Sequence, residues 1–509
     1  MNTNDLQNEI FNSDKQQIEK QGEMKKKSSL CIWLLFLFIS LINAFPIFYF
    51  RYVPFQDHPS HLLKANIIRH YGDRELRYFE NFEINKIPVP NILTDYLTAG
   101  ISLILPIDIA SRLVIGFCVF LLPLSLWFWI SRTSPGGEYW ASLSWIMVWS
   151  KFLFAGNENF CFVTPILFYF WGILSKWDGR FHFPTILICI LLSTLIYFGH
   201  FLVFLLAGLG VLIHIFTIEF RSLKVWLTHI LIPLPGILLT IIWFSNFTDI
   251  SNELPTKVDF SPITKISALS GGISPFLWDI KPTKGWWLSL LLAIAIFVLW
   301  RAIVSLRKKI SFAPLLIIGC FLPAILLPEW FLIFIPNQRI WWIIFMCSLC
   351  LLPPKKEWII PIWFFTLVLF IGTSIDNVKF FKDKNKDLFV IDKVFSRFPK
   401  NLRLAYMGQP HLLVHLHRCF EYYHIRSGGV GLYHIMGESQ SVKCKNLPTK
   451  QHSIYDYGPQ VLGEWLDNYD AILIVAPQND MQALQSIEIL NKKNYRMFST
   501  LPYALLIHP

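Results

Sequence analysis

Long runs of uncharged apolar residues recur along this chain between about residues 30 and 373. A run of about 17–25 such residues is long enough to cross the hydrocarbon layer of a membrane as a helix. Within lipid, every backbone N–H and C=O group needs a partner inside the protein, and a helix meets this need within one segment. The sequence therefore predicts a polytopic α-helical membrane protein with about ten or eleven spanning helices.

The distribution of charge indicates membrane orientation rather than nucleic-acid binding. Hydrophobic residues make up 54% of the 509 residues and charged residues only 16%, with a net charge of +11. The basic residues cluster at the ends of apolar runs, as the positive-inside rule expects of cytoplasmic turns. Residues 1–29 are polar and end in three lysines, which predicts a disordered cytoplasmic tail followed by a retained signal anchor over roughly residues 30–50.

Alternating basic and weakly charged turns assign a side to each remaining connection. The turns expected in the cytoplasm are 131–132, 176–180, 221–224, 307–309 and 355–356, and those expected outside are 51–91, 155–160, 198–200, 245–284 and 328–339. Two apolar runs lie between residues 92 and 131, where the charge pattern requires an odd number of crossings. The first, residues 92–106, is short and carries Asp95, so we expect it to lie in the interface or to re-enter the membrane.

The last spanning helix, residues 357–373, leads outward, so residues 374–509 form an extracytoplasmic domain large enough for its own core. Strand-like runs at 402–407, 471–476 and 503–508, with a helical stretch at 481–491, predict a small α/β domain. The charged run 379–386 is typical of a linker. Cys419 and Cys444 lie in this region, where a disulfide between them is plausible outside the cytoplasm.

The outer loop 51–91 begins with a helix signal. Pro59 suits the first turn of a helix, and Asp57 or His58 is suited to cap it. Leu63 and Ile67 contribute to an apolar face. This pattern is typical of an amphipathic helix lying on the membrane surface. We therefore expect a transmembrane bundle over residues 30–373 whose outer loop 51–91 carries interfacial helices.

Polar side chains gather at the outer membrane edge in this topology. Ionisable residues at membrane depth are costly to bury, and they indicate a pathway or a functional site. Separate segments of the chain supply them, namely Asp57, His58, His61, Lys151, Asn157, Glu158, His200 and Arg339.

Each of these residues also has a purely structural interpretation. Asp57 is a good helix cap, and Glu158 fits a solvated turn. His200 is flanked by aromatic residues, as a hydrogen-bonded histidine inside a helix bundle would be. Lys151 can extend its amine to the interface, and Arg339 can anchor to lipid headgroups.

Other motifs favour structural roles. His411, His415 and His417 form an HxxxHxH pattern that could bind zinc on a helix, but no metalloprotease signature accompanies it. Cys347 and Cys350 lie inside an apolar run, where packing is favoured over metal or redox chemistry.

The arrangement from residue 30 to residue 373 resembles the GT-C superfamily of integral-membrane glycosyltransferases, which includes protein O-mannosyltransferases and aminoarabinose transferases. The resemblance rests on a cytoplasmic start, one helix, a large first outer loop with Asp57 at its head, and a following multi-helix bundle. It implies a polyprenyl-phosphate-linked sugar as donor and a lipid, protein or glycan acceptor outside the cytoplasm. It also implies location in a bacterial inner membrane, with the N-terminus in the cytoplasm.

The resemblance further implies roles for the polar residues. Asp57 corresponds in position to the first-loop acid and would act as general base in a single, inverting displacement. Glu158 corresponds approximately to an acid in the second outer loop. The cations Arg339 and Lys151 would stabilise the departing lipid phosphate. The substrate-binding candidates are His58, His61, Asn157 and His200.

Metal dependence and two other functions stay open. The first loop has no DxD pair, which argues against a divalent metal, although His58 or His200 could complete a ligand set with Asp57 and Glu158. A transporter or flippase would also need embedded charges, but no repeat is visible and the polar residues cluster at one face. The remaining alternative is a non-catalytic envelope assembly protein.

Overall fold

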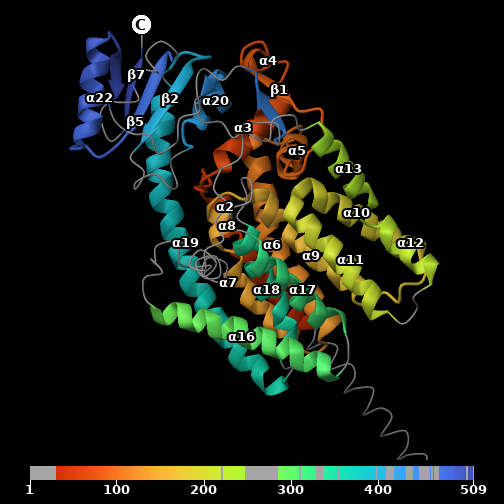
Figure 1. Ribbon diagram of the computed structural model, residues 1–509. Coiled ribbons are helices and arrows are strands. Elements are labelled where there is room, and N and C mark those ends of the chain that lie inside the picture. Colours follow the sequence, from red (N-terminus) through yellow and green to blue (C-terminus); the bar gives the residue numbers. More distant parts are fainter. Residues whose placement is uncertain are drawn as a thin grey trace, which may run out of the picture.

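The computed structural model consists of a helical bundle and a smaller mixed α/β domain joined by one long helix (Figure 1). It describes residues 30–218, 222–246, 285–308, 311–327, 336–352, 355–396, 398–408, 418–431, 440–445, 459, 462, 469–499 and 503–507. The N-terminal tail, most of the turn 245–284 and the HxxxHxH histidines lie outside the described residues.

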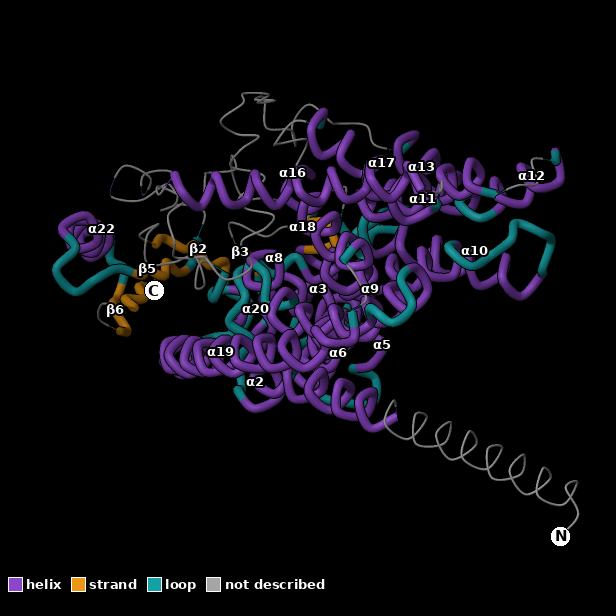
Figure 2. Tube along the Cα trace, turned by 90° about the horizontal axis from the view of Figure 1, so that it is seen from below, coloured by secondary structure: helices purple, strands orange, loops and turns teal. Residues whose placement is uncertain are grey.

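Helices α6 and α9 form the centre of the bundle, with α10, α11, α17 and α18 packed around them. The helix Leu30–Asn43 ends just before Pro46, and the short α2 follows, so the predicted first helix over 30–50 is broken. Figure 2 shows α16 and α17 on one side of the bundle and α19 with α2 on the other. The remaining bounds are α6 Ile107–Thr133, α7 Ser144–Met147, α8 Lys151–Phe154, α9 Glu158–Leu174, α10 Phe183–Gly199, α11 Phe201–Thr217, α12 Leu223–Leu231, α13 Leu234–Ser245, α16 Gly285–Lys308, α17 Phe312–Leu326 and α18 Pro336–Ser348, with α2 at Phe45–Tyr49. Short 3-10 helices occupy Glu138–Leu143, Leu349–Leu351 and Lys356–Trp358.

The lengths of the described helices give fewer full spans than the sequence predicts. By length and composition, α6 and α19 can each cross a membrane, and α12 with α13 adds a third span if this pair, bent by 53°, is counted as one. Other apolar helices among the described residues are only 10–17 residues long, namely Leu30–Asn43, α9, α10, α11 and α17. The predicted ten or eleven crossings are therefore not reached by length alone.

The short apolar run 92–106 forms one small helix. This helix, α5 (Leu93–Ile101), ends well before α6 begins at Ile107. Its Asp95 is completely buried. The segment is thus a nine-residue helix packed on protein, and α6 supplies the single long crossing of this region.

The charged run 379–386, predicted as a linker, lies within a helix. α19 (Ile359–Phe395) continues without interruption for 37 residues from the bundle to the C-terminal domain. Its later turns bury Phe381, Leu388, Ile391 and Phe395 at spacings of three, four and seven residues, while the lysines face outward. The predicted boundary at residue 374 therefore falls inside a continuous helix.

The outer loop folds against protein. It contains α3 (His58–Arg69), α4 (Tyr78–Asn81) and the strand β1 (Phe82–Ile84). α3 packs against α5 on one side and α20 on the other, and its Lys64 and Asn66 are buried. The polar face expected to meet water or lipid headgroups therefore contacts protein.

The C-terminal domain is a five-stranded mixed sheet in the order β3-β2-β5-β7-β6. β2 pairs in parallel with β3 and β5, whereas β7 is antiparallel to both β5 and β6. The bounds are β2 Arg403–Gly408, α20 Glu421–Ser427, β3 Val430–Gly431, β4 Val442–Cys444, β5 Ala471–Val475, α22 Met481–Lys492, β6 Arg496–Ser499 and β7 Tyr503–Ile507. The three predicted strands and the helix at 481–491 are confirmed, while β6 and the short strands were not predicted.

Strand β4 is not part of this sheet. It pairs antiparallel with β1 of the outer loop, and Cys444 lies opposite Phe82. Cys444 and Cys419 are both free thiols, so the predicted disulfide between them is wrong. Cys419 instead lies in the apolar core of the domain. Cys347 and Cys350 are also free and buried, in keeping with a packing role.

Candidate functional site

The head of the outer loop lies directly on the loop between α8 and α9. The backbone N–H groups of Gln56 and Asp57 donate to the carbonyl oxygens of Phe154 and Ala155, at 2.9 and 3.2 Å. Gly156 makes this approach feasible, since its φ is +78° and a Cβ there would lie 2.6 Å from the Asp57 nitrogen. The two loops that carry Asp57 and Glu158 are thereby fixed side by side.

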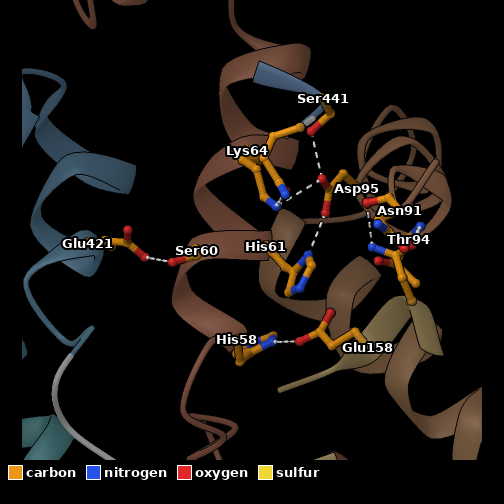
Figure 3. Close-up of polar contacts among 12 residues, drawn as sticks. His58, Ser60, His61, Lys64, Asn91, Thr94, Asp95, Glu158, Glu421 and Ser441 are labelled. Carbon is orange, nitrogen blue, oxygen red and sulfur yellow. Dashed lines mark hydrogen bonds and ion pairs between the residues drawn. The ribbon is translucent and has the colours of Figure 1, made fainter. Parts of the chain in front are cut away.

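His58 and Glu158 form a buried pair across these loops (Figure 3). The imidazole Nδ1 lies 2.6 Å from Glu158 Oε1, and the two side chains are 4% and 2% exposed. A carboxylate on Nδ1 fixes the orientation of the ring and directs Nε2 to the opposite side. Glu158 is therefore not a solvated turn residue.

Asp57 is the N-cap residue of α3, but it does not cap the helix with its side chain. Within the described part of the chain its carboxylate makes no capping hydrogen bond. Arg418 instead donates from Nε to Asp57 Oδ1 at 3.3 Å. Arg418 belongs to the C-terminal domain, so a residue from that domain reaches the head of the first outer loop.

Arg339, at the start of α18, closes the same end of the bundle. Its guanidinium contacts His200 Nε2 at 2.9 Å through Nη1, and it donates from Nη2 to Asn157 Oδ1 at 2.8 Å. The cation also lies 5.4 Å from the ring centre of Phe160. Arg339 is buried, and its partner Asn157 follows Gly156, which lies against the backbone of Asp57.

Lys151 and His61 have different partners. Lys151 donates from Nζ to Gln338, the neighbour of Arg339, so its amine points toward the Arg339 region. His61 Nδ1 lies 2.7 Å from Asp95, and Figure 3 shows the His61 ring between Asp95 and Glu158. The structure thus brings Asp57, His58, Asn157, Glu158, His200 and Arg339 together around one pair of loops, with Lys151 beside them and His61 in an adjoining cluster.

The cluster that contains His61 is centred on Asp95. Lys64 Nζ lies 3.3 Å from Asp95 Oδ2, and Ser441 Oγ donates to the same oxygen at 2.6 Å. Burial opposes ionisation, but the charges of Lys64 and His61, with hydrogen bonds from His61 and Ser441, outweigh it and lower the pKa of Asp95. Burial and Lys64 oppose protonation of His61, yet Asp95 and Glu158 raise its pKa.

The described residues contain no set of side chains that could coordinate a metal ion. Among them, no three His, Cys, Asp or Glu side chains are grouped closely enough to hold an ion. His58 contacts Glu158, whereas His200 contacts Arg339, so the two candidate histidine ligands have different partners.

Comparison with known proteins shows the fold. One similar solved structure is that of ArnT from Cupriavidus metallidurans in the apo state, which aligns over 94% of this chain and 98% of that chain. The TM-score is 0.55 and the sequence identity is 10%. This chain therefore shares the fold of ArnT. No family model matches the sequence, and no curated protein matches it.

Sequence reasoning missed the contribution of the C-terminal domain to this site. Arg418 contacts Asp57, Glu421 accepts a hydrogen bond from Ser60, and Ser441 contacts Asp95. These residues are more than 300 positions from their partners. One local signal was present, since Arg418 and Glu421 form an i,i+3 charge pair beside the apolar Cys419 and Phe420.

Proposed function

We propose that this protein is a membrane glycosyltransferase that transfers a sugar from a polyprenyl-phosphate donor to an extracytoplasmic acceptor with inversion. The observation that carries the proposal is that one loop, 155–157, contacts both the backbone of the acid Asp57 and the buried cation Arg339 of α18, within an ArnT-like fold. Asp57 would supply a base for an acceptor, and Arg339 a cation for a phosphate.

The chemistry is a single displacement. The acceptor oxygen attacks the anomeric carbon while Asp57 removes its proton, and the bond from that carbon to the phosphate oxygen breaks. The lipid phosphate leaves with an additional negative charge. Arg339 stabilises this charge through a guanidinium whose hydrogen bonds to Asn157 and His200 fix its plane.

The neighbouring residues have supporting roles in this proposal. Lys151 adds a second cation near the phosphate, beside Gln338. Glu158 orients His58, and His58 presents Nε2 to the substrate region. Asn157 and His200 hold Arg339, so they act on the donor through that side chain. His61, turned to Asp95, contributes to the local fold rather than to substrate contact.

Orientation and acceptor class follow from the same proposal. The site faces the outer side of a bacterial inner membrane, with residues 1–29 in the cytoplasm and the C-terminal domain outside. The acceptor is a lipid, protein or glycan that carries a nucleophilic hydroxyl. No step requires a metal ion.

The direct test is sugar transfer by purified protein in detergent with a synthetic polyprenyl-phosphate sugar. Asp57→Asn is expected to lower transfer by about 10²–10⁴-fold, the usual contribution of a general base. Glu80→Gln is the matched control, because Glu80 is an exposed acid of the same outer loop. Full transfer by the Asp57→Asn variant would refute the base assignment.

Donor binding is tested separately with Arg339→Gln, which keeps a hydrogen-bonding side chain but removes the charge. We expect KM for the donor to rise and kcat to fall, since the phosphate charge grows in the transition state. An unchanged dependence of rate on donor concentration would count against phosphate contact. Uptake of the lipid-linked sugar into proteoliposomes without glycosidic bond formation would favour transport instead.

A further inference from the structure

The C-terminal domain contacts the proposed catalytic acid directly. Arg418 Nε lies 3.3 Å from Asp57 Oδ1, and the two side chains are 9% and 25% exposed. The residues are separated by 361 positions in sequence. An ion pair that is largely shielded from water holds its geometry better than an exposed one, because water and salt compete less for its charges.

The same arginine also reaches a second carboxylate. Arg418 Nη1 lies 3.8 Å from Glu421 Oε1, and the Glu421 side chain is completely buried. Glu421 in turn accepts a hydrogen bond from Ser60 in the first turn of α3 (Figure 3). Asp57 and Ser60 lie at the start of α3. Two polar contacts therefore join this helix start to α20 and to Arg418 just before it.

We infer that Arg418 is a positioning residue of the proposed glycosyltransferase site, which the C-terminal domain supplies to hold the Asp57 carboxylate. The inference rests on the proposed function. A base must be oriented toward the attacking oxygen, and small displacements of a catalytic group reduce rate strongly. Arg418 fixes one carboxylate oxygen of Asp57 while its own guanidinium is held by Glu421.

The geometry explains why arginine suits this position. A planar guanidinium presents N–H donors in fixed directions, so Nε can donate to Asp57 while Nη1 lies on the side of Glu421, 3.8 Å away. A lysine amine at the same place is a point charge on a flexible stem. Lysine would keep the charge but lose the directed N–H donation to Asp57.

Docking of the C-terminal domain has other anchors, so a change at Arg418 should leave the domain in place. Asn66 donates to the carbonyl of Ile425 at 2.9 Å, and Tyr78 donates to the carbonyl of His424 at 2.7 Å. Arg426 pairs with Asp392 of α19 at 2.7 Å. These contacts do not involve Arg418.

The experiment compares sugar transfer by the full-length wild type, Arg418→Ala and Arg418→Lys in detergent. We expect Arg418→Ala to lower kcat by about 10–100-fold with an unchanged KM for the donor, since Arg339 is intact, and Arg418→Lys to fall between. Millimolar guanidinium should restore part of the Arg418→Ala activity. Arg403→Ala is the control, because Arg403 forms an exposed pair with Asp470 in the same domain.

The possible outcomes separate this inference from the proposed function. If the wild type transfers sugar and Arg418→Ala does so within about twofold, the positioning role is wrong while the function stands. A loss that guanidinium does not rescue, with a changed unfolding transition, would indicate a structural role only. If the wild type transfers no sugar, a double-mutant cycle of Asp57→Asn and Arg418→Gln on thermal unfolding still tests the contact. Additive effects in that cycle would overturn it.

Discussion

Replacing Asp95 by asparagine removes one negative charge from the interior of the protein while preserving the size of the side chain. The carboxylate is completely buried, and its partners are His61 at 2.7 Å, Lys64 at 3.3 Å and Ser441 at 2.6 Å. Lys64 is itself only 1% exposed. Asp95→Asn therefore leaves a buried ammonium group without the charge that compensates it.

The expected cost follows from this burial. Removing one partner of a buried ion pair destabilises a protein by about 3–5 kcal/mol, because the remaining charge stays out of water. Replacing both members with apolar residues of similar size removes that penalty, so Lys64→Met with Asp95→Leu should recover most of the loss. The order of stability is thus wild type and double variant above the single variant.

The free energy of unfolding can be measured by denaturant titration in mixed micelles, with the tryptophan fluorescence as signal. Asp383→Asn is the matched control, since Asp383 pairs with Lys386 on the exposed face of α19 and should change little. A loss below about 1 kcal/mol for Asp95→Asn would show that Lys64 does not depend on this carboxylate. A double variant no more stable than Asp95→Asn would refute the charge argument as well.

The remaining predictions concern backbone approach, pH and thiols. Gly156→Ala should lower sugar transfer by about tenfold or more, because the added Cβ would displace the backbone of Asp57. Gly208→Ala should leave transfer unchanged, since a Cβ at Gly208 would meet nothing within 4 Å. The folded protein raises the pKa of His61 above 6.5, so protonated His61 adds stability below pH 6.5, and this stability is lost as the pH rises through the folded pKa. His61→Gln should therefore flatten the fall in unfolding temperature as the pH rises above 6.5. A disulfide between Cys419 and Cys444 would remove two free thiols. Titration of the denatured, unreduced protein with a thiol reagent should instead count nine free thiols.

The sequence was most informative where local pattern decides structure. The strands β2, β5 and β7 and the helix α22 were predictable because each is a short apolar or amphipathic run bounded by polar residues. Asp57 was predictable as a site candidate from its place after the first helix. Its neighbours on the 155–158 loop and Arg339 followed from the alternation of charged turns.

Long-range pairing was the limit of prediction. Nothing near residue 418 indicates that its side chain will meet residue 57, because that contact depends on how α19 places the domain. The helical course of residues 379–386 was missed for a different reason. Its lysines form a charged run typical of a linker, whereas the spacing of Phe381, Leu388 and Phe395 indicates a helix.

The unbroken course of α19 makes the protein intolerant of small changes in chain length there. Inserting one residue into an α-helix turns everything beyond it by about 100° and advances it by about 1.5 Å. An insertion after Asn377 would therefore rotate Asn385, which holds the backbone of Tyr52 through hydrogen bonds of 2.9 Å in both directions. It would also carry Arg418 around the helix axis and away from Asp57. Seven inserted residues nearly restore the rotation but move the domain by about 10 Å along the helix axis, so the length of this helix determines whether Arg418 reaches Asp57.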